Sequence, residues 1–175
     1  MKDVSISKLV AENVQEAALF IDVMNSGEAA FVPSLAADRA SIAGHLRTLL
    51  QLEEVPSPRV LRLYEGQGRI CGFLGAAPRD PAMQSGSNFE SPAPQLVLQG
   101  PLLSIGDWAG HADALFRSLI GEISKMAENG GYAKHLELEF YPANRNIRRF
   151  AERHGFTIVP AGGDRFCTAR AAIAP

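Results

Sequence analysis

The residues most able to do chemistry gather in two stretches of the C-terminal half. The first, GDWAGHAD at residues 106–113, follows an apolar run and begins a helical pattern. The second, HLELEFY at residues 135–141, alternates glutamate with apolar residues and ends on tyrosine. The first could hold an anion, because a helix N-terminus carries unpaired N–H groups and a partial positive charge. The second could exchange protons, because carboxylates and phenols act as general bases and acids.

The start of the helix at Asp107 has two interpretations, which the residues leave open. Small residues at Ala109, Gly110 and Ala112 would let a phosphate approach the backbone closely. Asp107 is also a good N-cap, whose carboxylate would take the same N–H groups and repel a phosphate. His111 could donate to a phosphate or lie in solvent. We therefore expect either an anion site or a structural cap here.

The glutamates of the second stretch lie on one face of a predicted strand. Apolar residues alternate with Glu137 and Glu139, as the two-residue period of a strand requires. A carboxylate on this face could act as a general base through water, and Tyr141 could supply a proton. The alternatives are a half-exposed strand face or a partner for arginines, and an aromatic ring packed under a loop in the case of Tyr141.

The elements that must position these residues follow an α/β order. Runs of β-forming residues predict strands at 4–10, 59–66, 69–77, 95–105, 135–141, 156–160 and 165–172. Helical spacing predicts helices within 11–27, 34–55, 107–131 and 144–155. The order β-α-α-β-β-β-α-β-α-β-β predicts a mixed, mostly antiparallel sheet with flanking helices. The strand–helix–strand unit over 95–140 is typical of a parallel crossover.

Glycine and proline mark the irregular parts of this plan. Gly66-Gln67-Gly68 predicts a tight hairpin turn with positive φ. Gly100-Pro101 predicts a bulge or edge, because proline removes a ladder donor. Residues 78–95 are dense in Pro, Ser and Gly and predict a long loop, either functional or an insertion.

The helix at 144–155 carries four arginines on one side. Asn144 is a candidate N-cap, and Gly155 is a candidate stop. The apolar face consists of Ile147, Phe150, Ala151 and His154, and the arginines are Arg145, Arg148, Arg149 and Arg153. We expect these arginines to face solvent, with contact to a phosphate as the alternative for one or two of them.

The composition excludes several classes of protein. A chain of 175 residues that is 46% hydrophobic and 21% charged is expected to fold as one domain over 1–175. A net charge of −2 gives no global field for nucleic acid or anionic membrane. The sequence has no apolar run long enough for a membrane span or signal peptide, so we expect a cytoplasmic protein. Cys71 and Cys167 lack metal-ligand spacing, and we expect reduced, buried thiols and no metal.

The last third of the chain resembles a known family. The run LELEFYPANRNIRRFAERHGF is similar to the strand, Asn-opened helix and terminal Gly-Phe of the GNAT superfamily of N-acetyltransferases. Asn144, Phe150, Gly155 and Phe156 stand at the pattern positions, and the order of elements extends the resemblance over essentially the whole chain. The resemblance implies a GNAT-like acyl-CoA N-acyltransferase fold. It also implies transfer of an acetyl group from acetyl-CoA to an amine by direct attack in a ternary complex.

The resemblance further implies where the co-substrate binds. The fourth strand would bulge and splay from the fifth, its backbone would bind the acetyl group and pantetheine, and the next helix would bind the pyrophosphate at its N-terminus. The implied binding residues are Leu103, Ser104, Ile105, Gly110, His111, Ala112, Asp113, Ala114, Asn144 and Arg148. Glu139 and Tyr141 are the candidate catalytic base and acid. The acceptor site would lie near 25–36 and 160–165.

Two positions depart from the family's pattern. Asp107 stands where Arg or Gln is usual, and Ala151 stands where a tyrosine commonly protonates the departing thiolate. Losing a general acid slows a reaction by about 10²–10⁴. These departures favour an alternative, a non-catalytic module of the same fold with a remodelled CoA site, which could bind another ligand or dimerise. A different acyl donor is a third option.

Overall fold

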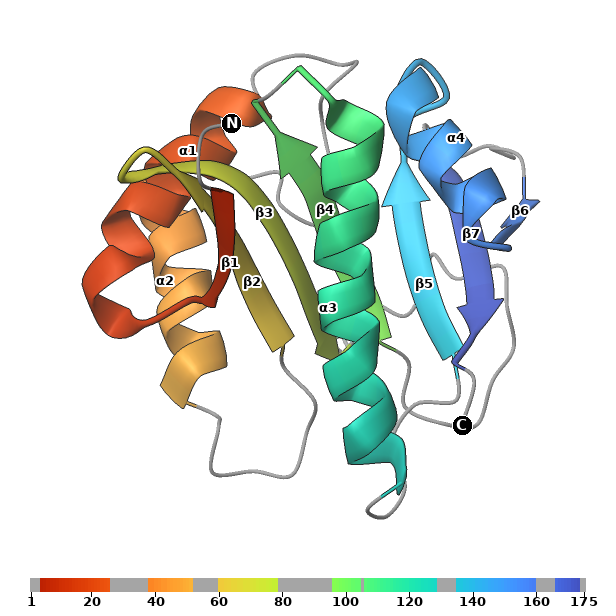
Figure 1. Cartoon of the computed structure of the whole chain (residues 1–175), viewed down its shortest axis with the longest axis horizontal. Coiled ribbons are helices and arrows are strands. Elements are labelled where there is room, and N and C mark those ends of the chain that lie inside the picture. The colour runs from red at the N-terminus through yellow and green to blue at the C-terminus, as the bar shows by residue number, and fades with distance from the viewer. Residues whose placement is uncertain are drawn as a thin grey trace.

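A seven-stranded sheet organises the chain (Figure 1). The computed structural model describes residues 4–25, 38–51, 60–78, 96–104, 106–128, 135–159 and 166–173. The strands are β1 (Val4–Lys8), β2 (Val60–Gly66), β3 (Arg69–Pro78), β4 (Leu96–Leu103), β5 (His135–Phe140), β6 (Thr157–Val159) and β7 (Cys167–Ala172). The helices are α1 (Val14–Met24), α2 (Arg39–Gln51), α3 (Trp108–Glu128) and α4 (Arg145–Arg153), with a short 3-10 turn at Ala11–Asn13 before α1.

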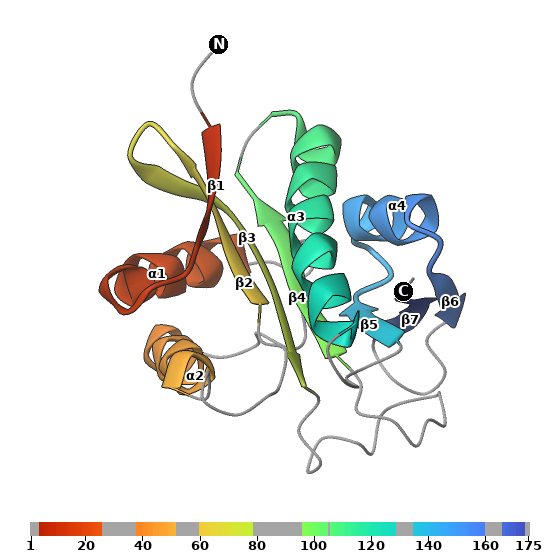
Figure 2. The same cartoon turned by 60° about the horizontal axis from the view of Figure 1, so that its bottom comes forward.

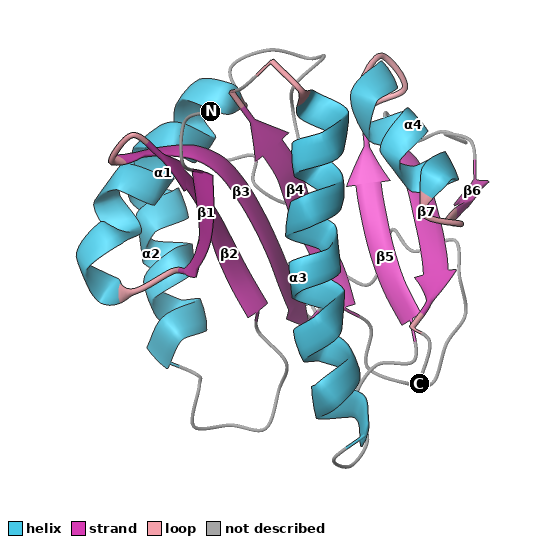
Figure 3. Cartoon of the chain, viewed as in Figure 1, coloured by secondary structure: helices cyan, strands magenta, loops and turns pink. Residues whose placement is uncertain are grey.

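The strand order in the sheet is β1-β2-β3-β4-β5-β7-β6. Every neighbouring pair is antiparallel except β4 and β5, which are parallel and joined through α3. The predicted α/β class, element order and mostly antiparallel sheet are therefore confirmed, as is the parallel pair over 95–140. Figure 3 shows the helices lying against this sheet, with short loops at its edges.

The helices cover both faces of the sheet (Figure 2). One core lies under α3 and α4 and includes Leu98, Leu138 and Phe150. The other lies under α1 and α2 and includes Phe73 and Leu102. Because successive strand residues point to opposite faces, β3 and β4 each supply side chains to both cores.

Local sequence signals account for most element boundaries. The β2–β3 turn has positive φ at Gln67 (55°) and Gly68 (70°), as the hairpin prediction required. The Asp38 carboxylate accepts a hydrogen bond of 2.8 Å from the Ser41 N–H and caps α2. Gly155, with φ of 74°, ends α4 as expected.

Several sequence predictions lie outside the described residues. They concern the loop at 79–95, the acceptor segments at 26–36 and 160–165, and Ile105. Within the described part of the chain, no helix is long and apolar enough to cross a membrane.

Candidate functional site

A cleft opens where β4 and β5 part. Their parallel pairing covers only Leu96–Leu98 of β4 and Leu136–Leu138 of β5. Beyond these residues β5 continues to pair with β7 as far as Phe140, while β4 continues to pair with β3 as far as Leu103. Beyond Leu98 of β4 and Leu138 of β5, the facing edges of the two strands therefore form no ladder with each other. Backbone groups on such an edge remain available to bind a ligand.

The bulge in β4 explains why the strands part. The Phe73 and Gly75 positions of β3 pair with Leu102 and Gln99, so β4 holds one more residue than β3 across this interval. The extra length falls at Gly100-Pro101, joined by a cis peptide bond. Gly100 has φ of 115°, and a Cβ there would lie 2.8 Å from the Phe73 carbonyl oxygen. Only glycine fits, and the bulge predicted at this position is confirmed.

A cavity of about 150 Å³ lies in this cleft. Its walls come from the end of β4, the start of α3, the start of α4 and the end of α1. The lining residues are Met24, Pro101, Leu102, Leu103, Trp108, Asn144, Asn146 and Ile147. Two predicted binding residues, Leu103 and Asn144, are therefore brought together. Ser104, which follows Leu103, is exposed, and its N–H donates to the Cys71 carbonyl oxygen at 2.9 Å.

The start of α3 carries the aspartate cap that the sequence raised as an alternative to an anion site. The Asp107 carboxylate accepts a hydrogen bond of 3.2 Å from the Gly110 N–H. A Cβ at position 110 would collide with this carboxylate, so a larger residue there would require the exposed Asp107 side chain to move. The cap therefore takes one of the N–H groups that a phosphate would need.

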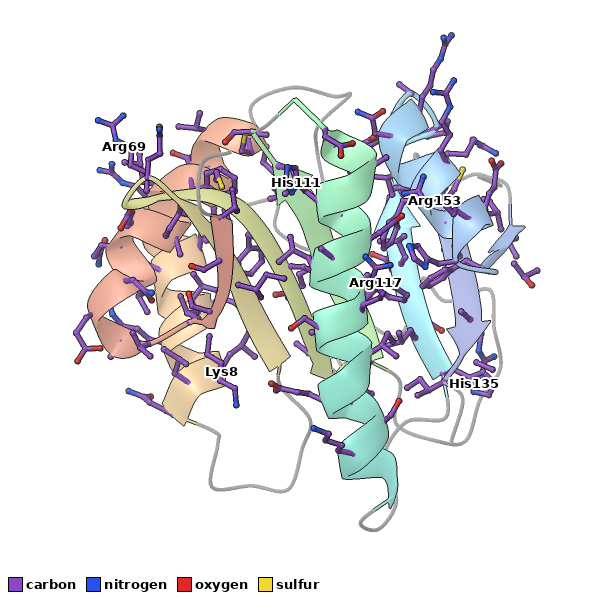
Figure 4. The ribbon with its side chains drawn as sticks, viewed as in Figure 1. Lys8, Arg69, His111, Arg117, His135 and Arg153 are labelled. Carbon is purple, nitrogen blue, oxygen red and sulfur yellow. The ribbon has the colours of Figure 1, made fainter. Side chains whose placement is uncertain are left out.

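The other predicted residues of the α3 start face different surroundings. Ala112 is fully buried in the core, and Ala114 is half-buried. His111 is half-buried on the side of α3 away from α4 (Figure 4). Asp113 turns toward α4, so the predicted residues of this segment do not share one surface.

Asp113 joins α3 to α4 rather than projecting into open solvent. Its Oδ1 lies 2.7 Å from Arg153 Nη2 and 2.8 Å from His154 Nε2. Figure 4 shows Arg153 lying between the two helices. Burial raises the pKa of Asp113, but hydrogen bonds from His154 and Arg153 outweigh burial and hold that pKa below its ordinary value. Arg153 remains exposed, as expected of the arginine face of α4, and binds Asp113 from there; the expectation that all four arginines face solvent is wrong for Arg148, which is half-buried.

The His154 ring completes an aromatic layer between α3 and α4. Its centroid lies 4.4 Å from that of Phe116 and 4.7 Å from that of Phe150. Trp108 meets Phe150 edge-on at 6.3 Å, so the indole at the cleft rim is fixed to this layer. The layer holds the start of α3 against α4.

The start of α4 is built as the sequence predicted. The Asn144 side chain accepts a hydrogen bond of 3.1 Å from the Ile147 N–H and is 7% exposed. Arg148 is half-buried, with its guanidinium 5.8 Å from the Phe140 ring and 3.8 Å from Cys167 Sγ. Ala151 is fully buried in the core under α3 and α4. Arg148 thus packs toward β5 and β7.

The carboxylates of β5 are buried, not half-exposed. Glu137 is 0% exposed and Glu139 is 9% exposed, both on the face opposite α3. In the sheet Glu137 lies opposite Arg170 of β7, and Glu139 lies opposite Thr168. The alternative of a half-exposed strand face is therefore wrong. Tyr141 is half-buried just beyond β5, and its ring meets that of Phe166 edge-on at 6.5 Å.

Sequence reasoning missed several residues of the cleft. Met24, Trp108 and Asn146 line the cavity, and only the indole carried a signal, as a large aromatic at a helix start. Gln99 of β4 is 4% exposed, and its Nε2 lies 2.9 Å from His45 Nε2 of α2. Among the described residues, no cluster of His, Cys, Asp and Glu could hold a metal ion.

Comparison with known proteins gives matches of structure alone. No protein-family model matches the sequence, and no curated protein matches it. The yncA protein from Salmonella typhimurium, solved with its cofactor acetyl-CoA, matches with a TM-score of 0.68 at 10% identity, over 98% of this chain and 94% of its own. The GNAT-family acetyltransferase from Streptococcus pneumoniae matches with a TM-score of 0.64 at 14% identity, over 98% and 100%. This chain has the GNAT fold.

A third match extends the GNAT-fold comparison to a protein acetyltransferase. RimL, a ribosomal L7/L12 α-N-protein acetyltransferase solved with coenzyme A, matches with a TM-score of 0.62 at 13% identity, over 97% of this chain and 94% of its own. At these identities the matches establish the GNAT fold. The matches alone do not show which reaction this chain catalyses, and that argument depends on the residues described above.

Proposed function

We propose that this protein transfers an acetyl group from acetyl-CoA to an amine of a small molecule or peptide, by direct attack in a ternary complex. The observation that carries this proposal is the cleft at the bulge of β4. There an unpaired strand edge, two helix starts and a cavity of about 150 Å³ meet. GNAT-fold neighbours solved with acetyl-CoA or coenzyme A add support.

The cleft suits an extended acyl-pantetheine arm. Pro101, Leu102 and Leu103 supply apolar surface beside backbone groups, and Asn144 and Asn146 supply amides on the opposite wall. In this proposal Leu103, Ser104 and Ile105 bind the arm, as the family resemblance implies. Such an arm needs few charged partners, and the described residues that line the cavity include none.

The phosphates of acetyl-CoA fit the start of α3 less well than the pantetheine arm fits the cleft. Gly110 through Ala114 would meet the pyrophosphate, yet the Asp107 carboxylate now takes the Gly110 N–H. Binding would therefore require this carboxylate to turn away, at a cost in affinity. His111 and Arg148 remain the proposed hydrogen-bond donors to the phosphates, although Arg148 packs toward Phe140 in this structure.

One side chain of β5 and one just beyond it are proposed for proton transfer. Glu139 stands one position beyond the last residue of β5 that pairs with β4, so its strand opens into the cleft there. It would take the proton that the attacking amine loses. Tyr141 would return a proton to the departing thiolate, since Ala151 has none to give.

Isothermal titration with acetyl-CoA tests this proposal, with adenosine 3′,5′-bisphosphate as a matched ligand that lacks the pantetheine arm. We expect saturable heat with acetyl-CoA and much weaker heat with the bisphosphate, because the arm supplies most of the contact. Thiol release in the presence of a panel of amines then reports turnover. No detectable heat with acetyl-CoA at millimolar concentration would exclude the proposal.

A second candidate function is a non-catalytic ligand-binding or interaction module. The Asp107–Gly110 cap and the buried Ala151 favour it, because the first weakens a phosphate site and the second removes an expected acid. CoA-dependent acetylation of any amine in the panel would rule this candidate out.

A further inference from the structure

The cavity in the cleft is lined from both faces of the sheet. Met24 of α1 and Leu102 of β4 pack with the core under α1 and α2, whereas Leu103, Trp108 and Ile147 pack with the core under α3 and α4. Leu102 and Leu103 are successive residues of β4, so their side chains point to opposite faces. The cavity therefore reaches across the sheet at the end of β4, from one layer of helices to the other.

The two ends of this cavity differ in chemistry. On the α4 side, Asn144 and Asn146 carry amides, and Asn146 is exposed to solvent. On the α1 side, Leu102, which is 3% exposed, and the half-buried Met24 supply apolar surface. An acyl-pantetheine arm carries amides along its length and ends in a hydrocarbon group. It matches this cavity with its amides beside the asparagines and its acyl end beside Met24.

Met24 is the last residue of α1 and forms part of the apolar end of the cavity. Figure 1 shows the end of α1 beside the end of β4, in agreement with the cavity that Met24 shares with Pro101 and Leu102. The Met24 side chain also packs against the core under α1 and α2. An unbranched thioether adapts to a neighbouring group, but the core behind it limits how far it can withdraw.

The volume of the cavity limits what it can hold. A cavity of about 150 Å³ with apolar walls holds a group the size of benzene, about six heavy atoms. An acetyl group, the thioester sulfur and the ethylene carbons next to it together have about that size. Each further methylene on the acyl chain must displace a wall, and Met24 is the flexible wall that the chain meets.

We propose that Met24 is a specificity-determining residue, which limits the donor to short acyl groups, acetyl or propionyl. This inference rests on the proposed function and adds the class of acyl donor. The transfer itself is unchanged. The amine nitrogen bonds to the acyl carbon, the carbon–sulfur bond breaks, and the sulfur leaves with the electron pair and takes up one proton while the amine loses one. Met24 contacts only the hydrocarbon end of the acyl group.

Isothermal titration with a series of acyl-CoA donors tests the inference on the full chain. For the wild type we expect hexanoyl-CoA to bind about tenfold more weakly than acetyl-CoA, because the longer chain overpacks the cavity. Met24→Ala opens the apolar end, where each buried methylene adds about fourfold in affinity. Butyryl-CoA should then bind about tenfold more tightly than acetyl-CoA. The same order of donors in Met24→Ala and wild type would overturn the inference.

Two further variants separate the volume of the side chain from other effects. Met24→Leu nearly conserves the volume and should keep the wild-type order of donors. Leu19→Ala shortens an exposed apolar side chain on the same helix, outside the described lining of the cavity, and should also keep that order. Alanine favours a helix, so circular dichroism should show that Met24→Ala keeps its fold. A switch to longer donors in Leu19→Ala would contradict the assignment to Met24.

The methyl signal of Met24 gives a readout in the wild-type protein. The chain has four methionines, so the ε-methyl NMR signals are few, and that of Met24 is assigned by its loss in Met24→Leu. We expect a larger saturable shift of this signal with acetyl-CoA than with CoA, because only the acyl group reaches Met24. Equal shifts would overturn the inference. If no acyl-CoA donor gives heat, the proposed function fails; if the donors bind but Met24→Ala keeps the wild-type order, the inference alone fails.

Discussion

The two helix starts that border the cleft are built alike but differ in charge and burial. At α3, Asp107 Oδ1 accepts from the Gly110 N–H at 3.2 Å, and at α4, Asn144 Oδ1 accepts from the Ile147 N–H at 3.1 Å. Asp107 is exposed and charged, whereas Asn144 is 7% exposed and neutral. Both caps satisfy helix N–H groups. The charged, exposed cap can be displaced by an anion, whereas the neutral, buried cap is part of the packing.

The two helix starts differ in which parts of the site depend on the backbone and which on side chains. The bulge of β4 and the parting of the strands follow from Gly100-Pro101 and need no charged side chain. The phosphate-facing helix start depends on which side chain precedes it, and here that side chain is an acid. The shape of the cleft and its electrostatics are therefore set by different residues.

The largest expected effect on stability follows from removing the buried N-cap of α4. Asn144→Ala should lower the free energy of unfolding by about 1–2 kcal/mol, because the Ile147 N–H is left unpaired away from water. Asp107→Ala should cost about half as much, since water reaches the exposed N–H. Urea denaturation of both variants measures the difference. Equal losses would show that burial does not distinguish the two caps.

Removing the charge from the α3 cap and adding a charge to the α4 cap should change the affinity for acetyl-CoA in opposite directions. Asp107→Asn keeps a good cap and removes the charge that repels phosphate, so the Kd for acetyl-CoA should fall about fivefold. Asn144→Asp adds a charge to the cleft wall and should raise that Kd. Calorimetry measures both.

The charge exchange has a matched control. Glu12→Gln also removes one exposed acid, but before α1, and it should leave the Kd for acetyl-CoA unchanged. A Kd for Asp107→Asn that equals that of Glu12→Gln would mean that the Asp107 carboxylate does not oppose the phosphates.

The smallest expected effect concerns the ion pairs that hold α3 to α4. The pKa of Asp113 is lowered in the folded state, so its contribution to stability is present above the unfolded pKa and is lost as pH falls through the folded pKa. Asp113→Asn should cost about 0.5 kcal/mol at neutral pH, and this difference should shrink below about pH 4.

Urea denaturation of Asp113→Asn as a function of pH measures this effect. Glu152→Gln on the exposed side of α4 is the control and should follow the wild type at every pH. A stability difference between Asp113→Asn and wild type that persists unchanged at low pH would contradict the assigned ion pairs.

Local signals made much of the fold predictable from sequence. The alternation in HLELEFY, the Asn144 cap, the Gly155 stop and the Gly100-Pro101 irregularity each act within a few residues, and each is found where it was expected. These features need no knowledge of distant contacts.

The parts of the site that were missed depend on distant contacts. Gln99 and His45 are 54 positions apart, and neither residue type signals a pair by itself. The Asp113–His154 contact spans 41 positions. The alternation of β5 predicted two unlike faces, but it could not show that Glu137 and Glu139 are both buried.

A crystal structure with acetyl-CoA would show directly whether the acyl donor binds in the cleft between β4 and β5. We expect the pantetheine arm in the cavity between Leu103 and Asn144, along the edge of β4 that does not pair with β5, with the Asp107 carboxylate turned away from the Gly110 N–H. Acetyl-CoA bound elsewhere, or a cleft that stays empty at saturating ligand, would contradict it.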